Sequence, residues 1–235
     1  MLNIKRYPFI SLLVSMFLMG MMAPAANATL MLSVSDGGTP INYTDNGAGD
    51  LVPLNGMLTA TPSFPTNFIG NTITGASKPL IGGNTIGRLD LNSINISVGP
   101  GTLTIMLTDT DFMVANGLYR ILTEIGGTLD GSISVNTYVD DANIAFATTT
   151  LVSTITSSDS FFSAGTNSFA NLSGMFSITH VVTLTHTGPG QISSFDLSTT
   201  VPEPNGLALI GLGILLLGGY FKGSRQYREI SSPAC

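Results

Sequence analysis

The chain has 235 residues, with 9% charged side chains, 43% hydrophobic side chains and a formal net charge of −6. Charged residues are far scarcer than the roughly 25% of an ordinary soluble domain, while the apolar content excludes a disordered chain. The acidic balance excludes a nucleic-acid partner, because nucleic-acid recognition requires a basic surface. The single cysteine cannot form an internal disulfide or supply a cysteine-based zinc site.

Residues 1–28 have the three parts of a secretory signal peptide. A charged start precedes an apolar run, and small residues then form a cleavage site for signal peptidase. These features are Lys5 and Arg6, the run from Phe9 to Met22, and Ala26 and Ala28 around Asn27. The run is short for a membrane span of about 20 residues, which disfavours the alternative of a retained anchor. The sequence therefore predicts a mature chain that starts at Thr29.

A second targeting segment lies at the other end of the chain. The sequence Val201-Pro202-Glu203-Pro204 precedes an apolar stretch at residues 207–221. Proline interrupts both helices and strand ladders, so the motif separates a body from a tail. We expect a transmembrane helix at residues 205–222, since a buried amphipathic helix would need a polar face that this stretch lacks. Basic residues follow it at Lys222, Arg225 and Arg228.

Basic residues beside a membrane span stay in the cytoplasm. We therefore expect residues 229–235 to be a short cytoplasmic tail and the body to lie outside the inner membrane. With the signal peptide at residues 1–28 and the tail from residue 201, this body comprises residues 29–200.

The proline–glutamate–proline motif, the apolar span and the basic cluster of residues 201–228 together resemble the PEP-CTERM protein-sorting domain of Gram-negative bacteria. The resemblance implies export by the general secretory route and recognition of the tail by a membrane transpeptidase-like enzyme called exosortase. It also implies an association with exopolysaccharide and biofilm production. The run at residues 102–112 is similar to the bodies of other PEP-CTERM proteins, which implies a fold but no chemistry.

The body has three basic and twelve acidic side chains, a balance of −9. Apolar residues alternate with polar ones in the stretches 102–108, 132–139 and 178–185, as in half-buried strands. Gly-Pro-Gly at residues 99–101 and 188–190, and Asn-Gly pairs such as Asn116-Gly117, predict turns. We expect an all-β fold: a single β-sandwich-like domain between the signal peptide and the C-terminal transmembrane helix.

Two finer features of the strands are also predicted. The apolar phase changes between Leu89 and Val98, which predicts a β-bulge or a strand corner. Residues 142–156 are long enough for a helix, but their threonine and β-branched content favours a strand.

The candidate metal ligands of the body are Asp109 and Asp111. At a spacing of two residues their carboxylates would share a strand face, roughly 6–7 Å apart. Calcium binds such oxygens but needs six or more ligands, so the alternative is a strand end that faces water. Calcium is the only cofactor that the sequence suggests. The acidic turn at residues 45–50 is a weaker candidate, and the Asp140-Asp141 pair ranks below it.

His180 and His186 also share a predicted strand face. Six residues separate them by roughly 20 Å in a straight strand, which excludes a shared metal ion. We expect both to be partly exposed at the ends of an apolar stripe. The body has no Gly-x-Ser-x-Gly motif and no other catalytic pattern.

The sequence thus predicts an exported, non-enzymatic envelope or extracellular-matrix protein, sorted by an exosortase and associated with exopolysaccharide. It would be anchored in the inner membrane with its body in the periplasm, and after processing would reach the outer envelope or the cell exterior. Its partners would be signal peptidase, exosortase and exopolysaccharide. The alternatives are a calcium-dependent glycan- or matrix-binding module and, ranked lower, a secreted hydrolase.

Overall fold

Every regular element in residues 30–202, the part of the chain that this computed structural model describes, is a β-strand. The strands are β1 (Met31–Ser35), β2 (Ile41–Thr44), β3 (Met57–Ala60), β4 (Phe68–Ala76), β5 (Gly87–Ser97), β6 (Gly101–Thr128), β7 (Ser132–Asp140), β8 (Thr150–Ser157), β9 (Phe161–His186) and β10 (Ile192–Val201). The prediction of an all-β fold is confirmed for these residues, which contain no helix able to cross a membrane.

Most of the targeting predictions lie outside the described residues. These are the signal peptide with its cleavage site at Ala26, Ala28 and Thr29, the transmembrane helix, Glu203, Pro204 and the basic cluster. Within the described part, β10 ends at Val201 and Pro202 follows it directly.

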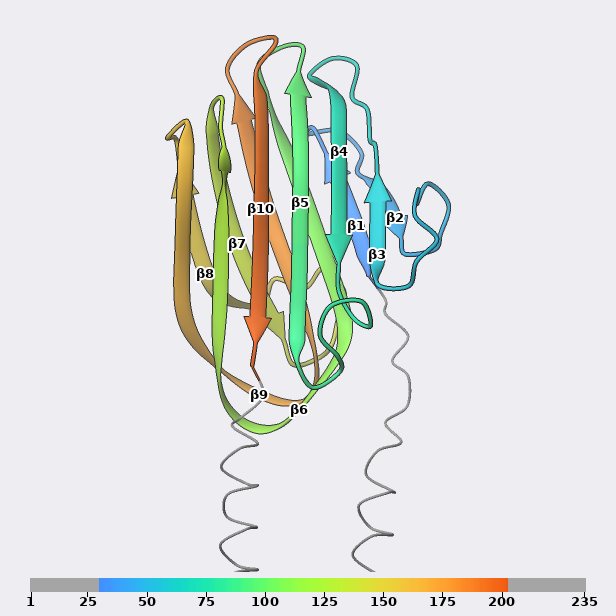
Figure 1. The fold of residues 1–235 in the computed structure, drawn as a ribbon, viewed down its shortest axis with the longest axis vertical. Coiled ribbons are helices and arrows are strands. Elements are labelled where there is room, and N and C mark those ends of the chain that lie inside the picture. Colours follow the sequence, from blue (N-terminus) through green and yellow to red (C-terminus); the bar gives the residue numbers. More distant parts are fainter. Residues whose placement is uncertain (1–29, 203–235) are drawn as a thin grey trace, which may run out of the picture.

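The strands form one antiparallel sheet that folds into two layers (Figure 1). The front layer has the order β3-β4-β5-β10 and continues through residues 117–128 of β6 to residues 161–172 of β9. The back layer has the order β2-β1, then residues 101–109 of β6, residues 177–186 of β9, β7 and β8. The two layers face each other as a β-sandwich, as the sequence predicts.

β6 and β9 have 28 and 26 residues, far more than the usual 5–6 or so, because each belongs to both layers. They remain paired while they wrap round the lower end of the sandwich in Figure 1. The register shifts between Asp109 and Phe112 and between Val114 and Gly117, where bulges allow the bend. The Asn116-Gly117 pair, predicted to be a turn between strands, is part of this bend instead.

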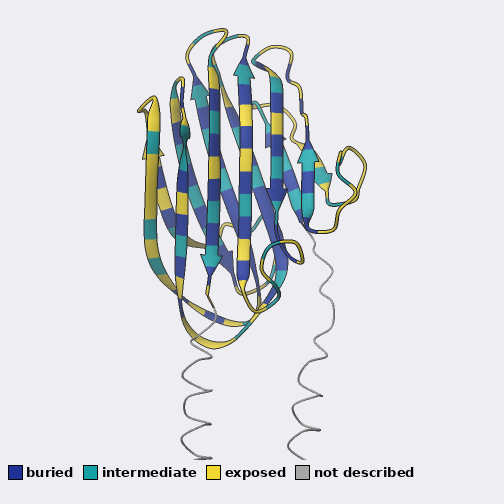
Figure 2. Ribbon diagram, in the orientation of Figure 1, coloured by how far each residue is buried: buried dark blue, intermediate teal, exposed yellow. Residues whose placement is uncertain are grey.

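The core lies between the layers and consists of alternate residues of the strands. Figure 2 shows that buried positions alternate with intermediate or exposed positions along β5 and β10. The apolar faces predicted from the sequence are confirmed, with buried side chains at Leu103, Ile105, Leu107, Ile133, Val135, Val139, Ile178, Val182 and Leu184.

The β-bulge or strand corner predicted between Leu89 and Val98 does not occur within β5. The register shift opposite Ile96 and Ser97 lies in β4, between Phe68 and Gly70. β5 pairs with β10 without a register shift, and its inward positions continue from Leu91 to the buried polar residues Ser93 and Asn95. Ile94 points outward and is 51% exposed. The change of apolar phase therefore marks a polar end of the core, not a change of strand face.

The strand predicted at residues 142–156 is right only from residue 150, where β8 begins. Residues 141–149 form a loop over the outer face of β6 and β9. The Asp140 carboxylate accepts a hydrogen bond from the Ile144 amide at 2.9 Å, and Asn143 and Phe146 have positive φ angles of 58°. These contacts stabilise a turn, which local β propensity alone does not reveal.

Candidate functional site

A depression of about 660 Å³ lies on the outer face of the front layer, across β5, β10, β6 and β9. Three carboxylates and one guanidinium line it, together with hydroxyl groups. These polar side chains are Arg88, Asp90, Glu124, Ser163, Asp196 and Ser198. We call this feature the acidic depression.

The antiparallel register brings the three carboxylates together. Ser198 lies opposite Asp90 on one side and Glu124 on the other, so these residues form a row across β5, β10 and β6. Asp196 is two residues along β10, in the next row of the same face. Neighbouring strands are about 4.8 Å apart, and residues i and i+2 of one strand are about 6.7 Å apart. The backbone positions of the three acidic residues therefore lie within roughly 10 Å of one another.

Glycine residues keep the floor of the acidic depression open. Gly165 of β9 lies opposite Glu124, and Gly126 of β6 lies opposite Asp196. A Cβ atom at Gly165 would lie 3.5 Å from Cγ of Glu124, an ordinary contact. The backbone therefore does not require glycine at this position. The absence of a side chain at Gly165 leaves space between the charged side chains.

Asp90 has the most perturbed carboxyl group of the acidic depression. Burial, followed by repulsion from Asp196, raises the pKa of Asp90 to about 6, and Arg88 opposes this shift. Asn92 donates a hydrogen bond to Asp90 Oδ1 at 2.8 Å. At mildly acidic pH this group is thus a mixture of a carboxylic acid, which can donate a hydrogen bond, and a carboxylate, which only accepts.

Asp109, a predicted calcium ligand, is buried and bound to a lysine. Its Oδ2 atom accepts hydrogen bonds from Lys78 Nζ at 2.8 Å and from Ser77 Oγ at 2.5 Å. Lys78, which is also fully buried, donates to the Thr110 carbonyl and lies 4.1 Å from the centroid of the Phe112 ring. This ion pair connects the segment after β4 to the bend of β6.

Asp111, the second predicted ligand, is turned away from Asp109 by the bulge. It has a φ of 64°, and its Oδ1 atom accepts a hydrogen bond from Asn143 Nδ2 at 2.6 Å. The expectation that both carboxylates share one strand face is therefore wrong, while calcium binding itself stays a prediction. Within residues 30–202, no group of three His, Cys, Asp or Glu side chains is arranged to hold a metal ion.

The carboxylates of the weaker acidic candidates accept hydrogen bonds from nearby backbone amides. Asp45 accepts a hydrogen bond from the Gly56 amide at 2.7 Å, and Asp50 accepts from the Thr59 amide at 3.0 Å. The Asp140 carboxylate binds the loop that follows it. These contacts agree with the interpretation of residues 45–50 as a turn.

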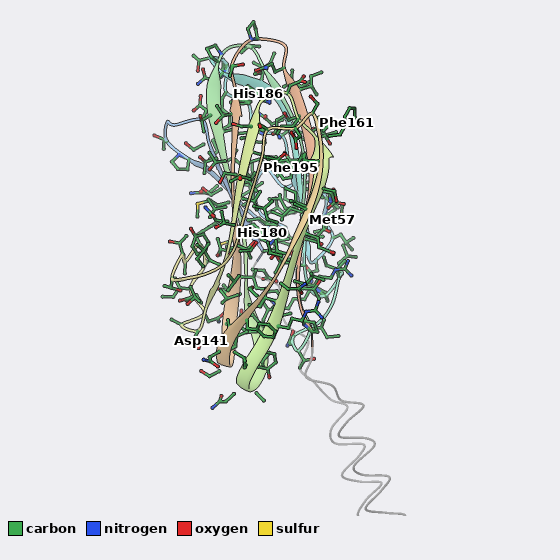
Figure 3. All side chains as sticks on the ribbon, turned by 90° about the vertical axis from the view of Figure 1, so that its left-hand side faces the viewer. Met57, Asp141, Phe161, His180, His186 and Phe195 are labelled. Atoms are coloured by element: carbon green, nitrogen blue, oxygen red, sulfur yellow. The ribbon has the colours of Figure 1, made fainter. Side chains whose placement is uncertain are left out.

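His180 and His186 point into the core between the two layers (Figure 3). They share a strand face as predicted, but the expectation of partial exposure is wrong, since both are buried. Each Nε2 atom lies 2.8 Å from a hydroxyl oxygen of β10, that of Thr199 for His180 and that of Ser193 for His186. Burial lowers the pKa of His180 to about 3, so both geometry and charge state fit a structural role between the layers.

The acidic depression itself was missed from the sequence, because Asp90, Glu124 and Asp196 are far apart in the chain. One local signal was available. Asp90 stands between Leu89 and Leu91, and Asp196 between Phe195 and Leu197, which predicts that each carboxylate faces outward from a strand.

Comparison with family models finds no match, and none of the curated proteins matches. Among solved structures, the Arthrobacter globiformis T6 isomalto-dextranase complexed with panose aligns at 11% identity and a TM-score of 0.28, over 49% of this chain and 23% of that one. TmCBM61 in complex with β-1,4-galactotriose aligns at 10% identity and a TM-score of 0.30, over 54% and 86%.

The K1 cleaved adhesin domain of Lys-gingipain from Porphyromonas gingivalis W83 aligns at 8% identity and a TM-score of 0.31, over 74% of this chain and 91% of that one. Likenesses this distant carry no functional argument. The function is therefore inferred from the surface of the chain itself.

Proposed function

We propose that this chain is an exported, non-enzymatic β-sandwich protein that binds a neutral polysaccharide in the acidic depression. The proposal rests on the grouping of three carboxylates and one guanidinium around the acidic depression, which has a volume of about 660 Å³ and two glycines in its floor. The charged residues are Arg88, Asp90, Glu124 and Asp196. Carboxylates accept hydrogen bonds and a guanidinium donates them. Each hydroxyl group of a sugar can donate one hydrogen bond and accept others, so it can bind both kinds of side chain.

The charge of the acidic depression selects among polysaccharides. Three carboxylates outnumber the one guanidinium, so the local field repels polymers that carry uronate or sulfate groups. Phe161 is exposed on the same face of β9, two residues from Ser163. Its ring offers an apolar surface on which the carbon-bearing face of a sugar can stack. A neutral, hydroxyl-rich polymer fits these features best.

Binding of the full-length chain in detergent micelles to immobilised neutral glycans and polyuronates tests the proposal. Asp90→Asn and Asp196→Asn should each weaken binding to the neutral glycan about tenfold or more, since hydrogen bonds to charged groups contribute roughly 1.5–3 kcal/mol. Asp159→Asn, in the turn between β8 and β9, removes the same charge elsewhere and should leave binding unchanged. No binding by the wild type, or equal losses in all three variants, would refute the proposal.

A secreted hydrolase is the second candidate, because the raised pKa of Asp90 beside two further carboxylates is a feature of acid–base glycosidases. We favour binding, since the depression lies open on a sheet face and does not enclose a scissile bond. Release of reducing ends from a bound glycan, abolished by Asp90→Asn, would establish the hydrolase instead.

We further propose that the signal peptide and the PEP-CTERM tail deliver the β-sandwich to the envelope or beyond it. The end of β10 at Val201 supports this proposal, because the motif then starts where the sheet stops. Mass spectrometry of the protein from its native cells should show Thr29 as the first residue and a shortened C-terminus. A mature chain intact through Cys235 would contradict processing of the exosortase type.

A further inference from the structure

Residues 161–172 of β9 form an unprotected edge of the front layer. β6 pairs with one side of this segment, and no strand within residues 30–202 pairs with the other. Proteins usually protect exposed edges with charged residues, prolines or bulges. This segment contains no charged residue and no proline, and it pairs with β6 without a register shift. Among the other edge strands, β2 and β3 have only four residues each, and β8 has eight but pairs with β7 through a register shift between Thr137 and Tyr138.

The hydrogen-bond pattern shows which residues face the open side. The Leu129 amide donates to the Ser160 carbonyl at 3.0 Å, so the backbone polar groups of Ser160 point toward β6. In an antiparallel ladder these groups alternate in direction from one residue to the next. The backbone groups that point away from β6 therefore belong to the odd-numbered residues, Phe161, Ser163, Gly165, Asn167, Phe169 and Asn171.

We propose that a second copy of this chain pairs with this edge, antiparallel, around a two-fold axis at Gly165. In this register Gly165 faces Gly165 of the second copy, and Ser163 faces Asn167. Phe161 then faces Phe169, once on each side of the axis. Every facing pair uses the backbone groups that point outward, so the two edges are complementary to themselves, as a two-fold interface requires.

The exposed side chains of the edge agree with this partner. Phe161 is 81% exposed and Phe169 is 63% exposed, although both are large and apolar. Pairing would bring the Phe161 ring of one copy against the Phe169 ring of the other, and aromatic pairs across neighbouring strands stabilise antiparallel sheets. Residues 161–172 carry no charge, so no charged side chains face each other directly across the new pair of strands.

The dimer joins the two front layers into one continuous sheet. A two-fold axis between edge strands of a continuous sheet runs perpendicular to that sheet, so the outer faces of both copies point to the same side. The two acidic depressions would then face one surface together. The pairing does not rest on the glycan function, but if both hold, the dimer would bind a polymer at two points and gain affinity from this bivalency.

Disulfide trapping tests the register in the full-length chain in detergent micelles, with Cys235→Ser as the background. Gly165→Cys should form an intermolecular disulfide under mild copper–phenanthroline oxidation, since facing residues of a hydrogen-bonded pair have Cα atoms about 5.5 Å apart. Ser163→Cys is the matched control on the same face. It should not cross-link to itself, because two Ser163 residues would be four positions out of register, but should cross-link to Asn167→Cys in a mixture.

Light scattering after size-exclusion chromatography provides a second measurement. The wild type should have twice the protein mass of the 24.5 kDa chain, and Phe169→Asp should restore the monomer mass. Ile94→Asp, a similar change of an exposed residue on β5, should leave the dimer intact. A monomeric wild type, or cross-linking of Ser163→Cys as efficient as that of Gly165→Cys, would overturn the proposal. Loss of the dimer with retained glycan binding would leave the proposed function standing.

Discussion

Because His180 is buried, the free energy of unfolding of the sandwich should fall as the pH falls. Burial lowers the pKa of His180 from 6.5 to about 3 in the folded chain. Below pH 6.5 the unfolded chain therefore takes up a proton that the folded chain excludes, and stability falls as the pH falls from 6.5 toward 3. Each pH unit in this window costs about 1.4 kcal/mol, so the loss between pH 7 and pH 4.5 is about 2–3 kcal/mol.

Chemical denaturation of the wild type and of His180→Gln at pH 7 and pH 4.5 measures this contribution. Glutamine can keep a hydrogen bond to Thr199 but does not titrate, so the free energy of unfolding of the wild type should fall by about 2–3 kcal/mol relative to the variant. Asp90 is present in both proteins and cancels in the difference. Its pKa is raised to about 6, so its own contribution favours the folded chain at lower pH. A difference between wild type and variant that does not change with pH would refute the reasoning.

Further predictions concern the buried ion pair, a glycine and calcium. Lys78→Met leaves the Asp109 carboxylate buried without its cation and should cost about 3–5 kcal/mol in denaturation experiments. Adding Asp109→Asn to it should recover part of this loss, and strictly additive losses would contradict the coupling. A Cβ atom at Gly127 would overlap the Ser194 carbonyl oxygen, so Gly127→Ala should cost about 1–3 kcal/mol. Gly188→Ala, where a Cβ has no neighbour within 4 Å, should change little, and equal effects would contradict the packing. Millimolar calcium should leave the melting temperature unchanged, since Lys78 binds Asp109; a rise that a chelator reverses would restore the calcium hypothesis.

Some features of the fold follow from the sequence because their causes are local. The alternation of Leu103, Ile105 and Leu107 with threonines predicts a half-buried strand, and this face is buried in the structure. Side chains alternate between the two faces of any strand, so neighbours in the sequence are sufficient to recognise one. The Gly-Pro-Gly turns follow from similarly local restrictions on the backbone.

Other features depend on residues that are distant in the sequence. The same alternation does not show that β6 continues through a bend into a second layer, because the bend is stabilised by its long pairing with β9. It also does not show that Asp109 is buried, since the cation beside it comes from Lys78. Local patterns thus misread this aspartate as a solvent-facing ligand.

The sequence by itself determined that the chain forms strands, where some of them lie and which of their faces are apolar, because these properties depend on neighbouring residues. Only the tertiary structure decided that Asp90, Glu124 and Asp196 line one acidic depression, and that residues 161–172 form an edge with no neighbouring strand on one side. Both depend on which strands lie side by side and in what register. Strand order and register arise from the packing of the whole core, and no short segment contains that information.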